Sequence, residues 1–302
     1  MDRSKIILVL AVVLAVIIAA IVFHYLPRLS SFWQQADERE LQRREVPFIA
    51  QDLTRRLADI EQRSDFTSDL SFSLFENGEV SFHVHAMQAR QICPLHVHNN
   101  SEECDFIIKG KAKIHSVVTE EGGSRGPQRR GEILLEKNGL FYAPPGSPHE
   151  FLNATDEVLA CLVISTPPFQ GNLYLKEDSI SGEPWSSGSS GSTICSYQDL
   201  SSRADSMVGA GAGQVAVGRV DAFKNVEMRL MRTSSPLDEN MARGHDLVII
   251  YFRGEALFEI LDRKIELHPT YFLGIPVGTK FRITPREASQ DSCLLCIYLR
   301  PS

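Results

Sequence analysis

The feature that most constrains this chain is a pair of histidines two residues apart, followed by a glutamate and later by a third histidine. His96 and His98 flank one valine. Because side chains two apart in a strand share a face, these two imidazoles can bind one ion. Glu103, at the start of an apolar run, and His149, just after a Pro/Gly turn, can complete the set. Three neutral imidazoles and one carboxylate suit one divalent transition-metal ion, that is Fe, Mn, Ni, Cu or Zn.

The spacing of these residues resembles the two halves of the cupin signature. From His96 to Gly110 the sequence reads HxH, four residues, Glu, six residues and Gly. From Pro144 to Asn153 it reads PxG, two residues, His, three residues and Asn. The glycine usual six positions before the first histidine is replaced by Arg90. The resemblance implies a small double-stranded β-helix, or jelly-roll barrel, with the ion inside it.

Alternatives to this ligand set remain open at the level of sequence. The four side chains can instead form a buried polar cluster of hydrogen-bonded imidazoles. Glu102 competes with Glu103, although only Glu103 keeps the six-residue spacing to Gly110 that the resemblance requires. A second pair, His83 and His85, lacks the downstream acid. We interpret it mainly as strand residues facing the barrel mouth or solvent, with a role beside the ligands as the minority alternative.

Composition and charge narrow the class of protein. A chain of 302 residues has room for two domains. Its net charge of -7, its isoelectric point near 5.7 and the lack of a basic stripe argue against binding to nucleic acid. Of its six cysteines, Cys293 and Cys296 form a CxxC motif, which we interpret as buried unpaired thiols rather than a zinc or redox pair.

The amino-terminal segment predicts a membrane anchor. Ile6 to Phe23 is an unbroken run of 18 apolar residues, and as a helix it covers roughly 27 Å, close to the thickness of a hydrocarbon core. Arg3 and Lys5 precede the run and favour an inward amino terminus. A cleavable signal peptide is the alternative, but no small-x-small cleavage site follows the run. We therefore expect a single-pass signal anchor over residues 1–30, with the folded part on the extracytoplasmic side, the periplasm in a Gram-negative bacterium.

A helical connector is expected between the anchor and the first barrel. Residues 31–68 are rich in Gln, Glu, Arg and Leu, and Pro47 divides them. After the proline, apolar residues recur at spacings of four and three, as in an amphipathic helix; they are Ile49, Leu53, Leu57 and Ile60. We expect this stripe to pack on the following barrel. A partner subunit or the membrane surface is the alternative.

Two β-rich segments flank a Ser/Gly-rich linker. We predict a metal-binding cupin barrel over residues 69–178, a flexible linker over 179–204 and a second barrel over 205–302. Aligning Gly110 with Gly254 and the two Pro-x-Gly turns places every ligand position of the first barrel on a residue unsuited to that role; these are Asn240, Ala242, Leu247 and Phe281. The predicted fold is therefore all-β, a bicupin with one metal-binding and one degenerate barrel, preceded by a transmembrane helix and a short amphipathic helical segment.

Two functions follow from this prediction. Four protein ligands around an ion that accepts six leave two adjacent positions for a substrate, or for a substrate beside dioxygen. The first function is a membrane-anchored, extracytoplasmic, metal-dependent oxygenase, an oxidoreductase that acts on a small organic substrate with Glu103 as a proton shuttle. The second is a non-catalytic accessory subunit of a membrane protein complex or homo-oligomer, with a structural metal. An open barrel mouth favours the enzyme, and a plugged mouth favours the accessory subunit.

Overall fold

The computed structural model describes residues 47–62, 70–119, 128–169, 171–175, 195–207, 215–220, 223, 226–242, 244–286 and 291–299. The expected anchor, residues 31–46 of the connector and most of the expected linker lie outside these ranges. Among the described residues, no helix has both the length and the apolar character needed to cross a membrane.

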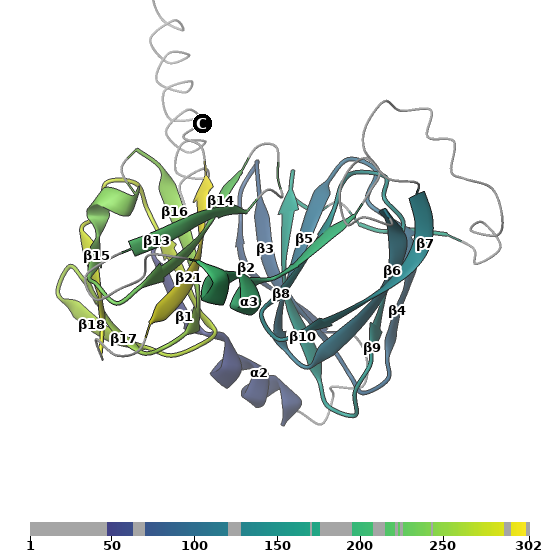
Figure 1. Ribbon diagram of the computed structural model, residues 1–302, viewed down its shortest axis with the longest axis horizontal. Helices are drawn as coiled ribbons and strands as arrows, with labels where there is room; N and C mark the ends of the chain where they lie inside the picture. The colour runs from purple at the N-terminus through teal and green to yellow at the C-terminus, as the bar shows by residue number, and fades with distance from the viewer. Residues whose placement is uncertain are drawn as a thin grey trace, which may run out of the picture. The chain divides into compact units, whose positions relative to one another are not determined.

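Antiparallel strands dominate the described residues, and the prediction of an all-β fold is confirmed (Figure 1). The first barrel consists of two facing sheets, ordered β12-β8-β5-β10-β3-β2 and β11-β4-β9-β6-β7. Its strands are β2 (Leu70–Glu76), β3 (Ser81–Met87), β4 (Ile92–Val97), β5 (Glu102–Lys109), β6 (Lys111–Thr119), β7 (Gln128–Glu136), β8 (Gly139–Ala143), β9 (His149–Asn153), β10 (Leu159–Thr166), β11 (Leu173–Tyr174) and β12 (Ser196–Asp199).

The second barrel repeats this plan with sheets ordered β1-β19-β16-β21-β14-β13 and β15-β20-β17-β18. Its strands are β1 (Ile49–Asp52), β13 (Val215–Val220), β14 (Glu227–Thr233), β15 (Leu237–Asp238), β16 (Asp246–Arg253), β17 (Ala256–Ile260), β18 (Arg263–Leu267), β19 (Tyr271–Ile275), β20 (Phe281–Pro285) and β21 (Ser292–Leu299). A short 3-10 helix, η2 (Glu239–Ala242), precedes β16.

The two barrels exchange edge strands. Strand β1 precedes the first barrel in sequence but pairs with β19 of the second. Strand β12 precedes the second barrel but pairs with β8 of the first. Each exchanged strand runs directly into a short helix, α2 (Leu53–Glu61) after β1 and α3 (Leu200–Ser206) after β12. Each barrel is therefore completed by the segment that leads into the other one.

A short sequence repeat underlies this exchange. Gln51-Asp52-Leu53 recurs as Gln198-Asp199-Leu200. Each aspartate is the N-cap of its helix and accepts a hydrogen bond from the backbone amide three residues on, at 3.0 Å in α2 and 3.3 Å in α3. The arginine four residues after each aspartate donates to the glutamine just before that aspartate. The strand-to-helix turn is therefore the same unit in both halves of the chain.

This arrangement corrects two expectations. The helix does not begin just after Pro47, because residues 49–52 pair with β19 and become a strand; it begins at Leu53, where Asp52 provides the cap. The expected linker also ends earlier than residue 204, because residues 196–206 form β12 and α3. In both places the partner strand lies far away in the sequence, so local spacing carried no indication of it.

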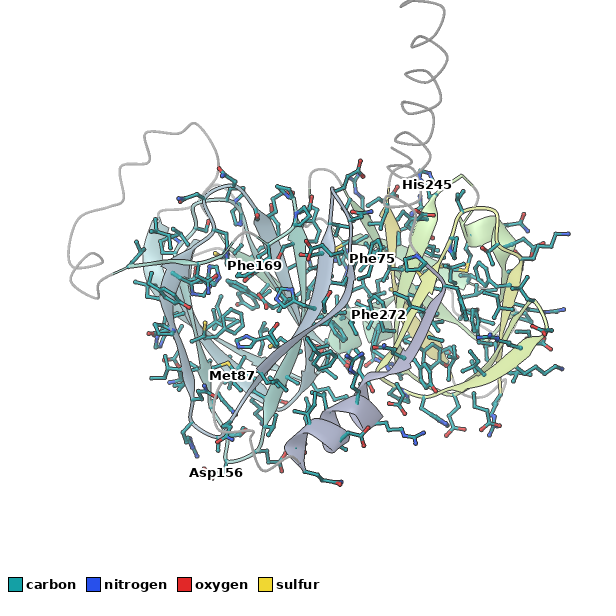
Figure 2. The ribbon with its side chains drawn as sticks, turned by 180° about the vertical axis from the view of Figure 1, so that it is seen from behind. Phe75, Met87, Asp156, Phe169, His245 and Phe272 are labelled. Atoms are coloured by element: carbon teal, nitrogen blue, oxygen red, sulfur yellow. The ribbon has the colours of Figure 1, made fainter. Side chains whose placement is uncertain are left out.

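An apolar cluster between the barrels holds them together. Leu53 and Leu57 of α2 belong to it, so the apolar stripe packs on the following barrel as expected, and on the second barrel as well. Across the cluster the ring centroids of Phe82 and Phe272 lie 5.6 Å apart. Phe272 is labelled in Figure 2. Burying large apolar side chains from both barrels in one cluster makes each barrel depend on the other for stability.

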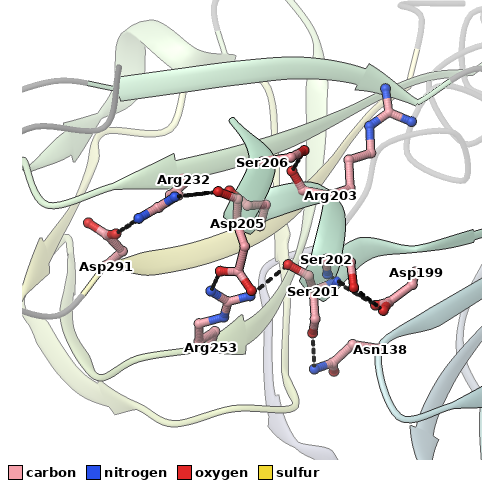
Figure 3. Close-up of polar contacts among 11 residues, drawn as sticks. Asn138, Asp199, Ser201, Ser202, Arg203, Asp205, Ser206, Arg232, Arg253 and Asp291 are labelled. Atoms are coloured by element: carbon pink, nitrogen blue, oxygen red, sulfur yellow. Dashed lines mark hydrogen bonds and ion pairs between the residues drawn. The ribbon is translucent and has the colours of Figure 1, made fainter. Parts of the chain in front are cut away.

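Polar contacts of α3 also join the two barrels (Figure 3). Arg253 of the second barrel lies 2.6 Å from Asp205 and donates to the Ser201 carbonyl at 3.0 Å. Asn138, in the turn before β8 of the first barrel, donates to the Ser201 hydroxyl at 3.1 Å. Helix α3 therefore contacts both barrels through side chains as well as through its buried face.

We expect Leu53→Ala to lower the free energy of unfolding by about 2–5 kcal/mol, because Leu53 is fully buried in the shared cluster and its loss leaves a cavity. Leu134, which is 56% exposed on β7, provides the matched control, and Leu134→Ala should change stability by about 0.5 kcal/mol or less. Urea denaturation followed by circular dichroism measures both. Equal effects of the two substitutions would show that α2 does not stabilise the fold.

Candidate metal centre

The structure brings the four predicted side chains together inside the first barrel. His96 on β4 and His149 on β9 are cross-strand partners, His98 directly follows β4, and Glu103 lies on β5 of the facing sheet. Their ligand atoms lie within 4.8 Å of one another, and all four residues are buried. Glu103 Oε2 lies 3.0 Å from His98 Nε2, and Oε1 lies 3.2 Å from His149 Nε2.

Backbone carbonyls orient two of the imidazoles. His96 Nδ1 lies 2.7 Å from the carbonyl oxygen of Pro94, and His149 Nδ1 lies 3.0 Å from that of Ser147. A carbonyl only accepts, so Nδ1 carries a proton in each ring, and Nε2 is the nitrogen that faces the centre and would bind an ion. Gly146 at φ +76° forms the turn before His149, and its amide donates to the His98 carbonyl at 2.8 Å. This turn ties the two histidine segments together.

The face of β5 decides between the two adjacent glutamates. Glu103 points into the barrel, whereas Glu102 points the other way and accepts a hydrogen bond of 3.0 Å from the Tyr142 hydroxyl. Successive side chains of a strand lie on opposite faces, so only one of the two can reach the histidines. The structure places Glu103 there.

Burial and mutual contact set the protonation of these groups. Burial lowers the pKa of His96 to about 3, with the neighbouring His149 acting in the same direction. Burial also acts to lower the pKa of His98, but the Glu103 carboxylate beside it outweighs burial and raises that pKa. Burial alone would raise the pKa of Glu103, yet its contacts with His149 and His98 hold it well below the usual range. These shifts favour an ionised carboxylate facing the imidazoles.

The cluster has the chemistry of a divalent transition-metal site. It offers three imidazole nitrogens and one carboxylate, the donor set that Zn, Fe, Mn, Ni and Cu accept. His98 Nε2 is buried, and its 3.0 Å contact with Glu103 Oε2 does not have the geometry of a hydrogen bond. A bound cation would satisfy this nitrogen and match the negative charge of Glu103. The residues therefore fit the ion that the sequence predicted, and they do not select one metal.

A cavity of about 210 Å³ adjoins the cluster, with His96 and Glu103 in its wall. The segment after β10 forms its rim. Phe169 is labelled in Figure 2. Its ring centroid lies 5.5 Å from that of His98 and 5.6 Å from that of His83. Tyr174 on β11 pairs with His96 of β4 and is 61% exposed. Space beside the ligands is thus reached past aromatic side chains at the barrel surface.

Phe141, a residue of β8 next to the site, does not plug this cavity. Its side chain is fully buried in the apolar cluster of the first barrel, with its ring 5.7 Å from the ring of His149. It supports the His149 imidazole from the core side and is absent from the cavity lining among the described residues.

Three cavity residues were missed or underweighted by the sequence analysis. His83 and His85 line the cavity, which favours the minority alternative of a role beside the ligands. Asp105 also lines it, is 3% exposed, and has its pKa raised well above the usual range by burial and by the adjacent Glu103. Its spacing of two from Glu103 on one strand was an available indication that it shares the inner face.

The interior of the second barrel is packed with apolar side chains. Leu247 and Phe281, at positions matched to first-barrel ligands, lie in its core together with Tyr251. The Tyr251 hydroxyl is 2.7 Å from the Ser292 hydroxyl, so the polar end of this large side chain has a partner. Among the described residues, a single group of His, Cys, Asp or Glu has the arrangement to hold a metal, and it lies in the first barrel.

The fold and site define a two-barrel protein of the double-stranded β-helix class, in which one barrel carries a cluster of metal-ligand side chains. Residues 69–180 match the family model described as Cupin. This match covers the first barrel, which is therefore similar to the cupin family, as the resemblance implied.

Solved structures with the same fold cover most of the chain. A mutant of salicylate 1,2-dioxygenase from Pseudoaminobacter salicylatoxidans matches with a TM-score of 0.60 and 12% identity, over 90% of this chain and 93% of that chain. A cupin 2 conserved barrel domain protein from Leptotrichia buccalis matches with a TM-score of 0.54 and 10% identity, over 85% of this chain and 98% of that chain. No curated protein matches the sequence. At such low identity these likenesses establish the fold alone.

We expect the purified full-length protein to hold about one equivalent of a divalent transition metal, and a His96→Ala/His98→Ala double variant to hold less than about a tenth of that, since two of four ligands are removed. Elemental analysis after dialysis measures both. His268→Ala is the control, because His268 is half-exposed on the second barrel. A wild-type protein that takes up no metal under conditions that load it would contradict the assignment.

Proposed function

We propose that this protein is a metal-dependent oxygenase that acts on a small organic substrate within the first barrel. The observation that carries the proposal is the cavity that contacts His96 and Glu103 and reaches the surface past Tyr174. A purely structural metal site needs no such space, because closed coordination by protein ligands is typical there. The printed activity of the salicylate 1,2-dioxygenases belongs to those proteins and supports oxygenase chemistry here as a hypothesis only.

Each part of the site has a role in this proposal. A bound divalent ion would supply Lewis-acid polarisation and, if redox-active, electron exchange with dioxygen. His96 and His149 keep their Nε2 lone pairs directed inward through hydrogen bonds to carbonyls. Glu103 can hold a proton from a substrate hydroxyl, because it lies in the cavity wall between two imidazoles. Phe169 and Tyr174 restrict the entry of water and flank a flat substrate.

A non-catalytic accessory subunit is the second candidate. Two observations favour it: the second barrel has a filled apolar interior, and its edge strand β13 exposes Val215 and Val217. An unpaired edge with apolar side chains can pair with another chain. The partner would be a membrane protein complex or a second copy of this chain.

We expect the metal-loaded full-length protein to consume dioxygen with a small enediol or catechol substrate, and Glu103→Gln to reduce this rate by roughly 10²–10⁴-fold, because the amide cannot take up a proton. Glu102→Gln is a closely matched control, since Glu102 lies next in the chain but faces away from the cavity, and it should retain wild-type activity. An oxygen electrode measures the rates, with metal content determined for each variant. Metal-loaded wild-type protein without activity on any such substrate would favour the accessory subunit.

We also propose that residues 6–23 anchor the protein in a membrane, with the barrels on the extracytoplasmic side. The support is the apolar run and the two basic residues before it. We expect the full-length protein to remain in the membrane fraction after alkaline carbonate extraction, and a variant without residues 1–30 to be released. Protease added to intact cells with a permeabilised outer layer should digest the barrels. Protection of the barrels from that protease would contradict the orientation.

A further inference from the structure

The cavity has a second polar wall, next to the metal ligands and formed by different strands. His83 of β3 and Asp105 of β5 both lie opposite Val163 of β10, in one row across the sheet. His85 lies two residues further along β3, on the same face. All three line the cavity, and we call His83, His85 and Asp105 the polar wall.

One side chain of the polar wall, Asp105, has a buried oxygen without a hydrogen-bond partner among the described residues. Asp105 is 3% exposed, and its Oδ2 has no hydrogen-bond partner among the described residues. Buried polar atoms are seldom left without a partner, because their transfer from water is unfavourable unless it is compensated. Since Asp105 faces the cavity, a polar group of a bound ligand can provide the missing partner.

The charge of the cavity limits what that polar group can be. None of the described residues that line it is a lysine or an arginine. Burial lowers the pKa of His83, so this histidine stays neutral near neutral pH, although the Glu103 charge acts in the opposite direction. A carboxylate or phosphate placed against this wall would be buried beside Asp105 without a counter-charge, which is strongly unfavourable.

We infer that the polar wall binds an uncharged hydrogen-bonding group, such as an amide or a hydroxyl, on the part of the substrate that faces His83 and Asp105. The inference rests on the proposed function for the reacting end of the substrate. The cavity of about 210 Å³ and the rings of Phe151 and Phe169 in its wall fit a single flat ring with small substituents. The substrate class is therefore a small neutral molecule, and acids with a remote carboxylate are rejected.

Two ligands of nearly equal size test this inference. 3,4-Dihydroxybenzamide and 3,4-dihydroxybenzoate share two adjacent hydroxyls and differ in the remote group, which is neutral in the first and anionic in the second. We expect the amide to bind at least about tenfold more tightly, because the anion lacks a counter-charge. Isothermal titration calorimetry without oxygen, on full-length protein in detergent, measures both ligands with and without bound metal.

Substitutions at His83 test whether the polar wall is where the amide ligand binds. His83→Leu removes the hydrogen-bonding nitrogens and should weaken binding of the amide about fivefold or more, with metal content unchanged. His83→Gln keeps a donor and an acceptor and should restore most of the affinity. His268→Leu, on the second barrel, should leave binding unchanged. Circular dichroism of each variant identifies any loss of folding, and the comparison of the two ligands on the wild-type protein does not depend on the variants.

The possible results separate this inference from the proposed function. Equal or tighter binding of the benzoate, no effect of His83→Leu in a folded protein, or no binding of either ligand would overturn the polar wall as a substrate site. Oxygen consumption together with a preference for the benzoate would retain the oxygenase and discard the wall. Selective, His83-dependent binding of the amide without oxygen consumption would retain the wall as a ligand site and discard the oxygenase.

Discussion

Strand β5 is the constraint on which the rest of this structure depends. Every side chain from Glu102 to Ile108 is buried, yet the two faces of the strand have opposite roles. One face places Phe106 in the apolar cluster between the barrels, and the other directs Glu103 and Asp105 into the first barrel. Because alternate residues of a strand are fixed on opposite faces, the packing that joins the barrels also sets the position of the carboxylate in the site.

The exchange of edge strands extends this dependence to the whole described fold. Strand β1 precedes the first barrel in the sequence but pairs with a strand of the second. Strand β12 precedes the second barrel but pairs with a strand of the first. The second barrel has lost the ligand positions but supplies half of the shared apolar cluster. The second barrel therefore contributes to stability, since a first barrel alone would expose that cluster to water.

The site itself combines unlike environments in a small volume. The histidine side is organised by backbone carbonyls that fix the ring nitrogens, whereas the facing wall carries carboxyl groups whose pKa values are shifted in opposite directions. Its imidazole neighbours lower the pKa of Glu103, whereas burial and the nearby Glu103 charge raise the pKa of Asp105. Two acids of the same strand thus acquire different roles from their surroundings.

The sequence by itself determined the all-β class, the four clustered side chains and the loss of ligands in the second half, because strand alternation and turn spacing are local properties that a motif retains. Only the tertiary structure decided that residues 49–52 are a strand of the second barrel and that His83 faces the same cavity as Asp105. These features depend on the register between strands distant in sequence, here β3, β10 and β5. Hydrogen bonding across a sheet fixes that register, and no local pattern records it.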